Sequence, residues 1–441
     1  MDEKITVPKR ILASLISSVS AGVVPRLGAP YIAIGRKEEI AALLSDLEAV
    51  SDGGAAMRFI IGNYGSGKSF LIQLLRGYAI ERGFICADCD LSPERRICGG
   101  KGTGIATYRE LIRNMSSKSS PEGGALQQII SRWLSSVQGE TAASGILPDS
   151  PDFGKEVSKR VFSLSKELEN NVGGFDFASV INAYYRATVS EDEEAQSQCL
   201  RWLRGEYTTK TEAKSALAVG SIIDDDNWYD FIKLWAEFVR KIGYKGFVVF
   251  IDECVNLYKI TNRISRENNY EKILSMFNDT LQGRAPGLSV IWGGTPQFLE
   301  DTRRGLFSYE ALRSRLIDSR FANNGEYRNL LGPVIRLRRL SDNELFALIS
   351  RVTKLHGMYF GWEPRVSENE MADFLRECLK RAGADIMITP REIIRDYMSV
   401  LNILFQNPDA EFTSIVGKSL TLENEDKKTD SSEFSLEDIE L

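Results

Sequence analysis

Residues 57–70 read MRFIIGNYGSGKSF, an apolar run that passes through a glycine-rich turn into the start of a helix. Residues 62–69, GNYGSGKS, match the phosphate-loop pattern G-x-x-x-x-G-K-[ST] at every position. Its glycines let the backbone adopt left-handed angles and approach a ligand that a Cβ atom would exclude. The successive N–H groups and the helix N-terminus then form a concave donor site for phosphate oxygens. Lys68 is expected to reach the β- and γ-phosphates of ATP, and the Ser69 hydroxyl to hold Mg²⁺.

The motif predicts a binding site for ATP with Mg²⁺ as its metal ion. The residues expected to bind the nucleotide are Gly62, Asn63, Tyr64, Gly65, Ser66, Gly67, Lys68, Ser69 and Phe70. The alternative is a glycine-rich strand-to-helix turn that binds nothing. The complete match, with a strand before it and a helix after it, disfavours that alternative. The motif does not indicate what the binding energy is used for.

The composition is that of an ordinary globular protein of more than one domain. The chain has 441 residues, of which 43% are hydrophobic and 26% charged, and two or three domains are expected. The net charge is −6. Residues 421–441 carry eight carboxylates against two lysines, so this acidic tail alone accounts for the net charge. The bulk charge of the remaining chain therefore neither suggests nor excludes nucleic-acid binding.

Cysteine and histidine usage gives no sign of a metal or redox site. The six cysteines show no paired framework, which fits a reduced cytoplasmic protein. Cys86 and Cys89 form a CxxC, but within an apolar run, FICADC, that favours a strand over a zinc or redox role. His356 is the only histidine and is expected to be structural. No apolar run approaches the ~18–20 residues of a membrane span, and the N-terminus does not resemble a signal peptide.

A second motif, GFVVFIDECVNL at residues 246–257, complements the phosphate loop. Five apolar residues suit a parallel strand buried on both faces, and two carboxylates follow where that strand ends. In α/β sheets ligands bind at these strand ends. Asp252 is therefore expected to coordinate Mg²⁺ and Glu253 to polarise the attacking water. The alternative, a strand that ends in a solvated acidic turn, is disfavoured by the phosphate loop.

The rest of the chain supplies three further strands and several helix starts. Strands are expected over residues 84–89 and 334–340, and another begins at Leu288 and leads into Gly293-Gly294-Thr295. Helices are expected over 5–24 and 266–282. Pairs that resemble capping boxes predict helix starts at Thr107, Ser341 and Thr389. The glycine-rich segment RRICGGKGTG before Thr107 is interpreted as a flexible loop, with contact to a ligand or partner as the alternative. The acidic clusters at 191–194 and 224–226 are interpreted as solvated faces or helix starts, with metal binding as the alternative.

The spacing of the motifs predicts the domain organisation. Lys68 and Asp252 are 184 positions apart, far more than one strand–helix–strand unit needs, so an inserted helical subdomain is expected at about residues 120–240. The expected divisions are an N-terminal helix at 1–30, an α/β core at 31–340, a small helical domain at 341–410 and a disordered acidic tail at 411–441.

The order of these motifs resembles the AAA+ ATPases, especially the branch related to origin-recognition and initiator proteins. The resemblance implies a parallel sheet of order 5-1-4-3-2 with a C-terminal helical lid. Arg36, in a Gly-Arg box, would lie beside the nucleotide. Thr295 would be sensor 1 and Arg391 sensor 2. Arg315, or Arg313, would be an arginine finger that acts on the ATP of a neighbouring subunit, which implies a homo-oligomer.

Longer stretches resemble the BrxD-like ATP-binding proteins of BREX phage-defence systems. They include GAPYIAIGRKEEIAALLSDL, ADCDLSPERR, NYEKILSMFNDTLQG and TPREIIRDYMSVLNILFQNP, and with the two motifs they cover nearly the whole chain. Cys254 stands where an apolar or acidic residue is expected. The resemblance implies a protein that works with other defence proteins.

Three functions are compatible with these patterns. The leading one is a Mg²⁺-dependent ATP-hydrolysing switch or motor of an anti-phage complex. The second is a nucleotide-gated module that binds duplex DNA, with hydrolysis as a timer. The third is a scaffold that binds ATP without turnover, which the Asp252–Glu253 pair disfavours. The second rests on a few basic residues, namely Arg336, Arg338, Arg339, Lys159 and Arg160.

Overall fold

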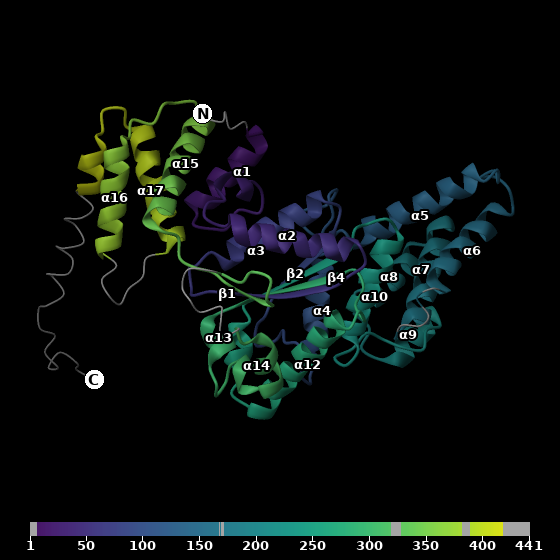
Figure 1. Cartoon of the computed structure of the whole chain (residues 1–441). Coiled ribbons are helices and arrows are strands. Elements are labelled where there is room, and N and C mark those ends of the chain that lie inside the picture. The colour runs from purple at the N-terminus through teal and green to yellow at the C-terminus, as the bar shows by residue number, and fades with distance from the viewer. Residues whose placement is uncertain (1–6, 167, 169–171, 319–327, 382–388, 418–441) are drawn as a thin grey trace, which may run out of the picture. The chain divides into compact units, whose positions relative to one another are not determined.

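The computed structural model describes residues 7–166, 168, 172–318, 328–381 and 389–417 (Figure 1). The predicted acidic tail lies outside the described residues from position 418 onward. The chain divides into two compact units. The sheet unit comprises Lys37–Asn63 and Leu74–Leu337, and the helical unit comprises the described residues of Met1–Arg36, Tyr64–Gln73 and Arg338–Leu441. The chain crosses from one unit to the other within the phosphate loop, because Asn63 ends a segment of the first and Tyr64 begins a segment of the second.

The sheet unit is built on five parallel strands. They are β1 (Ala56–Ile61), β2 (Ile85–Asp90), β3 (Phe247–Asp252), β4 (Leu288–Gly294) and β5 (Val334–Arg336). From one edge to the other the order is β2-β3-β4-β1-β5, and all four pairings are parallel. Counted from the β5 edge, this is 5-1-4-3-2. Every residue of β3 and β4 is buried, as expected for central strands covered on both faces.

Helices cover both faces of this sheet and fill the long connection between β2 and β3. Figure 1 shows α2 on one face and α12 and α14 on the other. The helices outside the connection are α2 (Lys37–Ser51), α3 (Lys68–Glu81, whose first turns belong to the helical unit), α11 (Val255–Tyr258), α12 (Arg263–Leu281), α13 (Pro296–Glu300), the 3₁₀ turn η2 (Leu306–Ser308) and α14 (Glu310–Leu316). The connection holds α4 (Thr103–Arg113), α5 (Leu126–Ala143), α6 (Phe153–Lys166), α7 (Gly174–Val189), α8 (Glu193–Leu203), α9 (Lys210–Leu217) and α10 (Trp228–Lys241).

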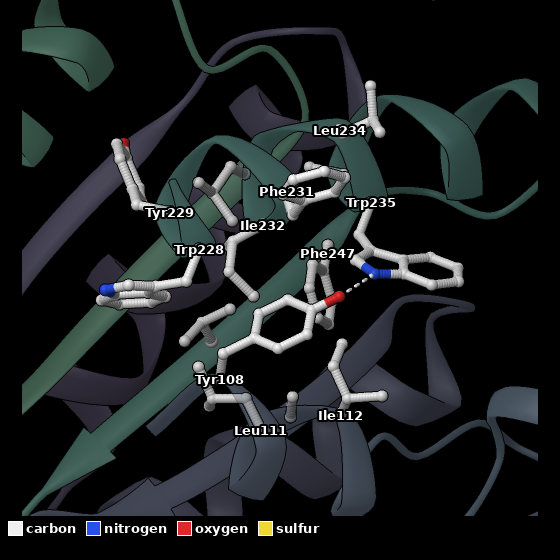
Figure 2. Packing of buried hydrophobic residues seen from close by; sticks show 14 of the residues in the cluster. Tyr108, Leu111, Ile112, Trp228, Tyr229, Phe231, Ile232, Leu234, Trp235 and Phe247 are labelled. Atoms are coloured by element: carbon white, nitrogen blue, oxygen red, sulfur yellow. Dashed lines mark hydrogen bonds between the residues drawn. The ribbon is translucent and has the colours of Figure 1, made fainter. Parts of the chain in front are cut away.

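The inserted helices share one hydrophobic core with the sheet. A continuous cluster of buried residues runs from the strands through α4 and α10 into α5, α7 and α8. Within it the Trp235 indole N–H donates to the Tyr108 hydroxyl over 3.0 Å (Figure 2). That hydroxyl donates to the Leu203 carbonyl over 2.8 Å. These bonds satisfy polar groups that would otherwise be costly to bury. The insertion is therefore anchored to the sheet by packed aromatic side chains.

The helical unit has a core of its own. It contains α1 (Lys9–Ser20), η1 (Ala29–Ile32), α15 (Asp342–Phe360), α16 (Glu368–Arg381) and α17 (Pro390–Gln406). Helix α1 packs against α15 and α17, and Leu15, Ile349 and Leu401 are fully buried between them. The N-terminal helix thus joins the C-terminal helices in one core. No described helix is long and apolar enough to span a membrane.

Several predicted boundaries need correction. Residues 5 and 6 of the helix predicted at 5–24 lie outside the described residues. Within the described part, α1 is confined to Lys9–Ser20, because Pro8 precedes its first turn and Gly22 follows its end at a φ of 64°. Strand β5 ends at Arg336 rather than at 340. The Leu337 N–H still donates to the Ile61 carbonyl over 2.7 Å, and the residues from Arg338 onward belong to the helical unit. Helix α12 begins three residues earlier than predicted, with Asn262 as its cap. The capping boxes at Ser341 and Thr389 are confirmed.

The predicted helix start at Thr107 is wrong. Helix α4 begins four residues earlier, and the Thr107 hydroxyl instead donates to the Arg96 carbonyl over 2.7 Å. The N–H groups of Gly102 and Ile105 donate to the two carboxylate oxygens of Asp225, each over 2.8 Å. A carboxylate from the far end of the insertion therefore caps this helix.

The glycine-rich loop before α4 is also held from a second side. The buried Asn269 side chain of α12 accepts from the N–H groups of Ile97 and Cys98 and donates to the Cys98 carbonyl. With its backbone bonded from both α12 and the insertion, the segment is not the free loop expected from its composition.

Candidate functional site

Three neighbouring strands end at one edge of the sheet and bring sequence motifs together. The Gly62 N–H donates to the Gly294 carbonyl over 3.1 Å, and the Cys254 N–H donates to the Gly293 carbonyl over 3.1 Å. The first residue of the phosphate loop, the Asp252–Glu253 pair and Thr295 therefore follow strands that lie side by side, with β4 in the middle. This is the edge at which ligands bind in α/β sheets.

The two carboxylates after β3 differ in setting. Asp252 is 9% exposed, and its Oδ1 accepts from the Glu253 N–H over 2.8 Å. Glu253 is exposed and has a φ of 54°, in the left-handed region that costs a residue with a Cβ atom about 1 kcal/mol. Strain of this kind at a strand end is characteristic of functional sites, so Glu253 stands out on geometry as well as on sequence.

Within the helical unit, two glycines of the phosphate loop adopt left-handed angles. Gly65 and Gly67 have φ values of 73° and 89°. A Cβ atom on Gly65 would overlap the side chain of Thr389, and one on Gly67 would lie 3.8 Å from the Arg36 guanidinium. Left-handed angles at these positions are those that a phosphate loop needs, and glycine adopts them without strain. The loop therefore fits the nucleotide that its sequence predicts.

Arg36 holds the loop from one side. Its side chain is 3% exposed, and Nη2 donates to the carbonyls of Ser66 and Arg338, each over 2.8 Å. One guanidinium thus connects the phosphate loop to the chain that enters α15.

Helix α17 begins beside the loop because Thr389, its N-cap, lies against Gly65. The Thr389 hydroxyl accepts from the Glu392 N–H over 3.3 Å, and the Glu392 carboxylate accepts from the Thr389 N–H over 2.7 Å. This reciprocal pair fixes the first turn of the helix, in which Arg391 is exposed. The sequence predicts only a capping role for Thr389, and its contact with Gly65 needed the structure.

A family model described as BREX system ATP-binding protein BrxC/D matches residues 7–419. The chain belongs to this family. Its match takes in the phosphate loop, the Asp252–Glu253 pair and the start of α17. A search of curated proteins finds no match to the chain.

The loop residues around the two glycines differ in exposure in this BrxC/D chain. Lys68 and Ser69 are half-buried at the start of α3. Tyr64 is 84% exposed, whereas Phe70 packs against the core of the helical unit. Asn63 is exposed.

Thr295 caps α13 directly after β4. Its Oγ1 accepts from the Phe298 N–H over 3.3 Å, which leaves the hydroxyl proton as a donor at the strand edge.

Asp90 joins the carboxylates at this edge and is not among the residues that the sequence predicts for the site. It ends β2 in register with Asp252, and the Leu91 N–H donates to the Asp252 carbonyl over 3.0 Å. Burial raises the pKa of Asp90 above its ordinary value, and the charges of Asp252 and Glu253 add to that rise. Its position at a strand end is the sequence signal that could have found it.

The side chains that the sequence assigns to Mg²⁺ are each of a type that this ion accepts. Among the described residues, no group of three or more His, Cys, Asp and Glu side chains could hold a metal ion. Mg²⁺ commonly binds through one or two protein oxygens, with water and substrate phosphates as its other ligands. Asp252 and the Ser69 hydroxyl are oxygen donors of this kind.

The two candidate finger arginines lie on α14. Arg315 donates from Nη1 to the Ala311 carbonyl over 2.7 Å, and Arg313 lies 3.7 Å from the Glu310 carboxylate. Both are exposed.

The basic residues that favoured DNA binding are largely ion-paired. Arg336 bonds to Glu300 and Asp318 over 3.0 and 2.9 Å, and Arg338 lies 3.2 Å from Glu344. On α6, Lys159 and Arg160 both pair with Glu156. Neighbouring carboxylates therefore offset much of the charge on which that hypothesis rests.

The CxxC cysteines lie in strand β2, as their apolar context indicates. Burial raises the pKa of both Cys86 and Cys89 to about 12, which keeps each as a thiol at neutral pH.

Proposed function

We propose that this BrxC/D protein binds ATP with Mg²⁺ and hydrolyses it as an AAA+ switch in a BREX-type anti-phage complex. The observation that carries the proposal is that three neighbouring parallel strands each lead into a sequence motif at the same edge of the sheet. The phosphate loop follows β1, the acidic pair follows β3, and a threonine follows β4, which lies between these two strands. The 5-1-4-3-2 order and the family description support it.

Binding is assigned to the phosphate loop and its neighbours. The N–H groups of residues 62–69 and the start of α3 surround the phosphates, and Lys68 offsets their charge. Ser69 and Asp252 supply oxygen ligands to the metal. Arg36 keeps the loop in shape through the Ser66 carbonyl. Bound Mg²⁺·ATP supplies the electrophilic γ-phosphorus and a good leaving group.

Hydrolysis is assigned to residues at the strand edge and to arginines. Glu253 orients and polarises the attacking water, and the Thr295 hydroxyl donates to the γ-phosphate or that water. Arg391, in the first turn of α17, offsets charge that develops on the γ-phosphate. Arg315 does the same on the ATP of a neighbouring subunit, so the active form is a homo-oligomer.

The test is to compare ATP binding and steady-state turnover in two variants. Lys68→Ala is expected to lose ATP binding, whereas Glu253→Gln is expected to bind ATP and lose turnover. Binding is followed with a fluorescent ATP analogue and turnover by phosphate release. Normal ATP affinity in Lys68→Ala would overturn the site. Wild-type turnover in Glu253→Gln would overturn the assigned mechanism, and tight binding without turnover in the wild type would favour an ATP-binding scaffold.

A further inference from the structure

Two surface loops of the sheet unit form a single basic surface. One is residues 259–262, between α11 and α12, and the other is residues 302–304, after α13. The Tyr258 hydroxyl bonds to the Asp301 carboxylate over 3.1 Å, and Arg304 Nη2 donates to the Ile260 carbonyl over 3.3 Å. These bonds hold the loops together, on the side of the sheet where Figure 1 shows α12, α13 and α14. We call the two loops, with the first turn of α12 that carries Arg263 and Arg266, the basic loop pair.

The charge of this surface is strongly positive. Residues 258–267 and 301–304 contain five cations and two carboxylates, a net charge of +3. The cations are Lys259, Arg263, Arg266, Arg303 and Arg304.

Local carboxylates offset only part of this charge. Glu267 pairs with Arg263 over 2.7 Å, and the Asp301 carboxylate accepts from the backbone N–H groups of residues 303 and 304. Across the described residues, Lys259 and Arg303 are exposed without an ion-pair partner. The surface therefore presents cations that a ligand can still neutralise.

Arg266 adds a buried positive charge to the basic loop pair. It is 6% exposed, and its Nη1 donates to the Ile260 carbonyl over 2.7 Å. Its Nε has no hydrogen-bond partner, and no carboxylate pairs with it among the described residues. A buried charge without a counter-ion is costly, and a bound anion would offset that cost.

The second guanidinium is oriented in advance. Arg304 lies over the Tyr258 ring with its Cζ 5.2 Å from the ring centre, while its Nη2 bonds to Ile260. The Ile260 carbonyl thus fixes two arginines side by side. Planar guanidinium groups held in this way match the oxygens of phosphate. The N-terminus of the 19-residue helix α12 adds partial positive charge at the same place.

We propose that the basic loop pair binds the phosphate backbone of a nucleic acid. Several separate cations spread over two loops suit a chain of phosphates better than a single small anion. Ile264, 70% exposed beside Arg263, provides an apolar contact for sugars or bases. The first loop follows Glu253 by only a short segment that contains α11, so a bound strand would contact residues close in sequence to the proposed hydrolysis site.

The test is nucleic-acid affinity as a function of salt, measured by fluorescence anisotropy on the full chain without nucleotide. The variant is Lys259→Ala/Arg263→Ala/Arg303→Ala, which leaves Arg266 and Arg304 in place. The matched control, Lys155→Ala/Lys159→Ala/Lys210→Ala, removes the same charge from exposed positions on the insertion. Labelled single-stranded and duplex DNA of about 30 nucleotides or base pairs are the probes, over about 50–300 mM salt.

The wild type and the control are expected to bind at least one probe with a steep salt dependence. The loop variant should bind at least tenfold more weakly, with a log–log slope shallower by roughly 2–3, because each lost phosphate contact removes about 0.7–0.9. Unchanged affinity and slope in the loop variant, or an equal loss in the control, would overturn the proposal. A wild type that binds neither probe would also overturn it. If that wild type instead bound a peptide of residues 418–441, the surface would be assigned to the acidic tail. Because no ATP is present, failure here leaves the proposed ATPase untouched.

Discussion

Nη2 of Arg36 lies 2.8 Å from the backbone carbonyl oxygen of Ser66 and donates a hydrogen bond to it. The Ser66 carbonyl and the Gly67 N–H group belong to the same planar peptide and point in opposite directions. A hydrogen bond to the carbonyl therefore also fixes the orientation of that N–H group in the loop. Because the same nitrogen also bonds to the Arg338 carbonyl, the loop geometry depends on the chain segment that enters α15.

Arg36→Ala is expected to weaken ATP binding at least tenfold and to lower the free energy of unfolding by about 2–3 kcal/mol, since two carbonyls lose a charged donor. Arg351→Ala is the matched control, because Arg351 also donates to a carbonyl, that of Tyr31, over 3.3 Å. Melting temperatures with and without ATP separate the two effects. If both variants retain the wild-type shift on adding ATP, Arg36 has no role in binding.

Glu253→Gly is expected to be more stable than Glu253→Gln by about 1 kcal/mol, because only glycine relieves the left-handed backbone at φ 54°. Both variants should lack turnover. Thermal unfolding of the two, beside the wild type, checks the order. A glycine variant less stable than the glutamine variant would show that the backbone at this position is not strained.

Arg315→Ala should bind ATP with wild-type affinity and lose turnover by about 10³-fold or more, as arginine fingers supplied in trans do. Arg313→Ala, two residues away on the same helix, is measured beside it, and a loss of turnover in that variant alone would assign the finger to Arg313. Mixing Arg315→Ala with Glu253→Gln tests whether the arginine acts between subunits. In a mixed oligomer, Arg315 of a Glu253→Gln subunit can act on the ATP of an Arg315→Ala subunit that retains Glu253, so turnover should reappear. Full activity of Arg315→Ala alone would remove it as the finger.

The helical unit should lose stability in acid through His356. The Trp362 indole N–H donates to Nδ1 over 2.9 Å, so Nε2 carries the proton of the neutral ring and donates to Asn402 Oδ1 over 3.1 Å. Burial lowers the pKa of His356 in the folded state, and the bond to Asn402 offsets only part of this. The contribution of neutral His356 to the free energy of unfolding is complete above the unfolded-state pKa of about 6.5. It is lost as the pH falls from there through the folded-state pKa.

Denaturant unfolding at about pH 7.5 and 5.5 measures this loss. His356→Gln keeps a neutral side chain that can both accept and donate, but it does not titrate. The wild type should therefore lose more stability than the variant between the two pH values. Equal losses would assign the acid sensitivity to carboxylates common to both proteins.

The features predicted correctly from the sequence are those with local causes. The five strands follow from apolar runs, and the capping box at Thr389 follows from residues three apart. The Thr107 start failed because the actual cap, Asp225, lies 120 residues from Ile105, and no local pattern reveals such a partner.

The candidate site likewise combines motifs that are contiguous in the sequence with contacts between distant segments. The phosphate loop and the Asp252–Glu253 pair are contiguous motifs, whereas the contact between Gly65 and Thr389 joins segments over 300 residues apart. An amphipathic helix likewise does not reveal which core it will join, so the packing of α1 with α15 and α17 needed the structure.

The placement of β2 bears on how the chain is made. Among the described strands its only neighbour in the sheet is β3, which begins 157 residues after β2 ends, although an isolated bridge joins Cys86 to Ser116. A ribosome that adds about 5–20 residues per second needs roughly 8–30 s to reach β3. During that time the nascent polypeptide carries an apolar edge whose pairing partner does not yet exist. Until β3 emerges, that edge is open to non-native pairing with other strands.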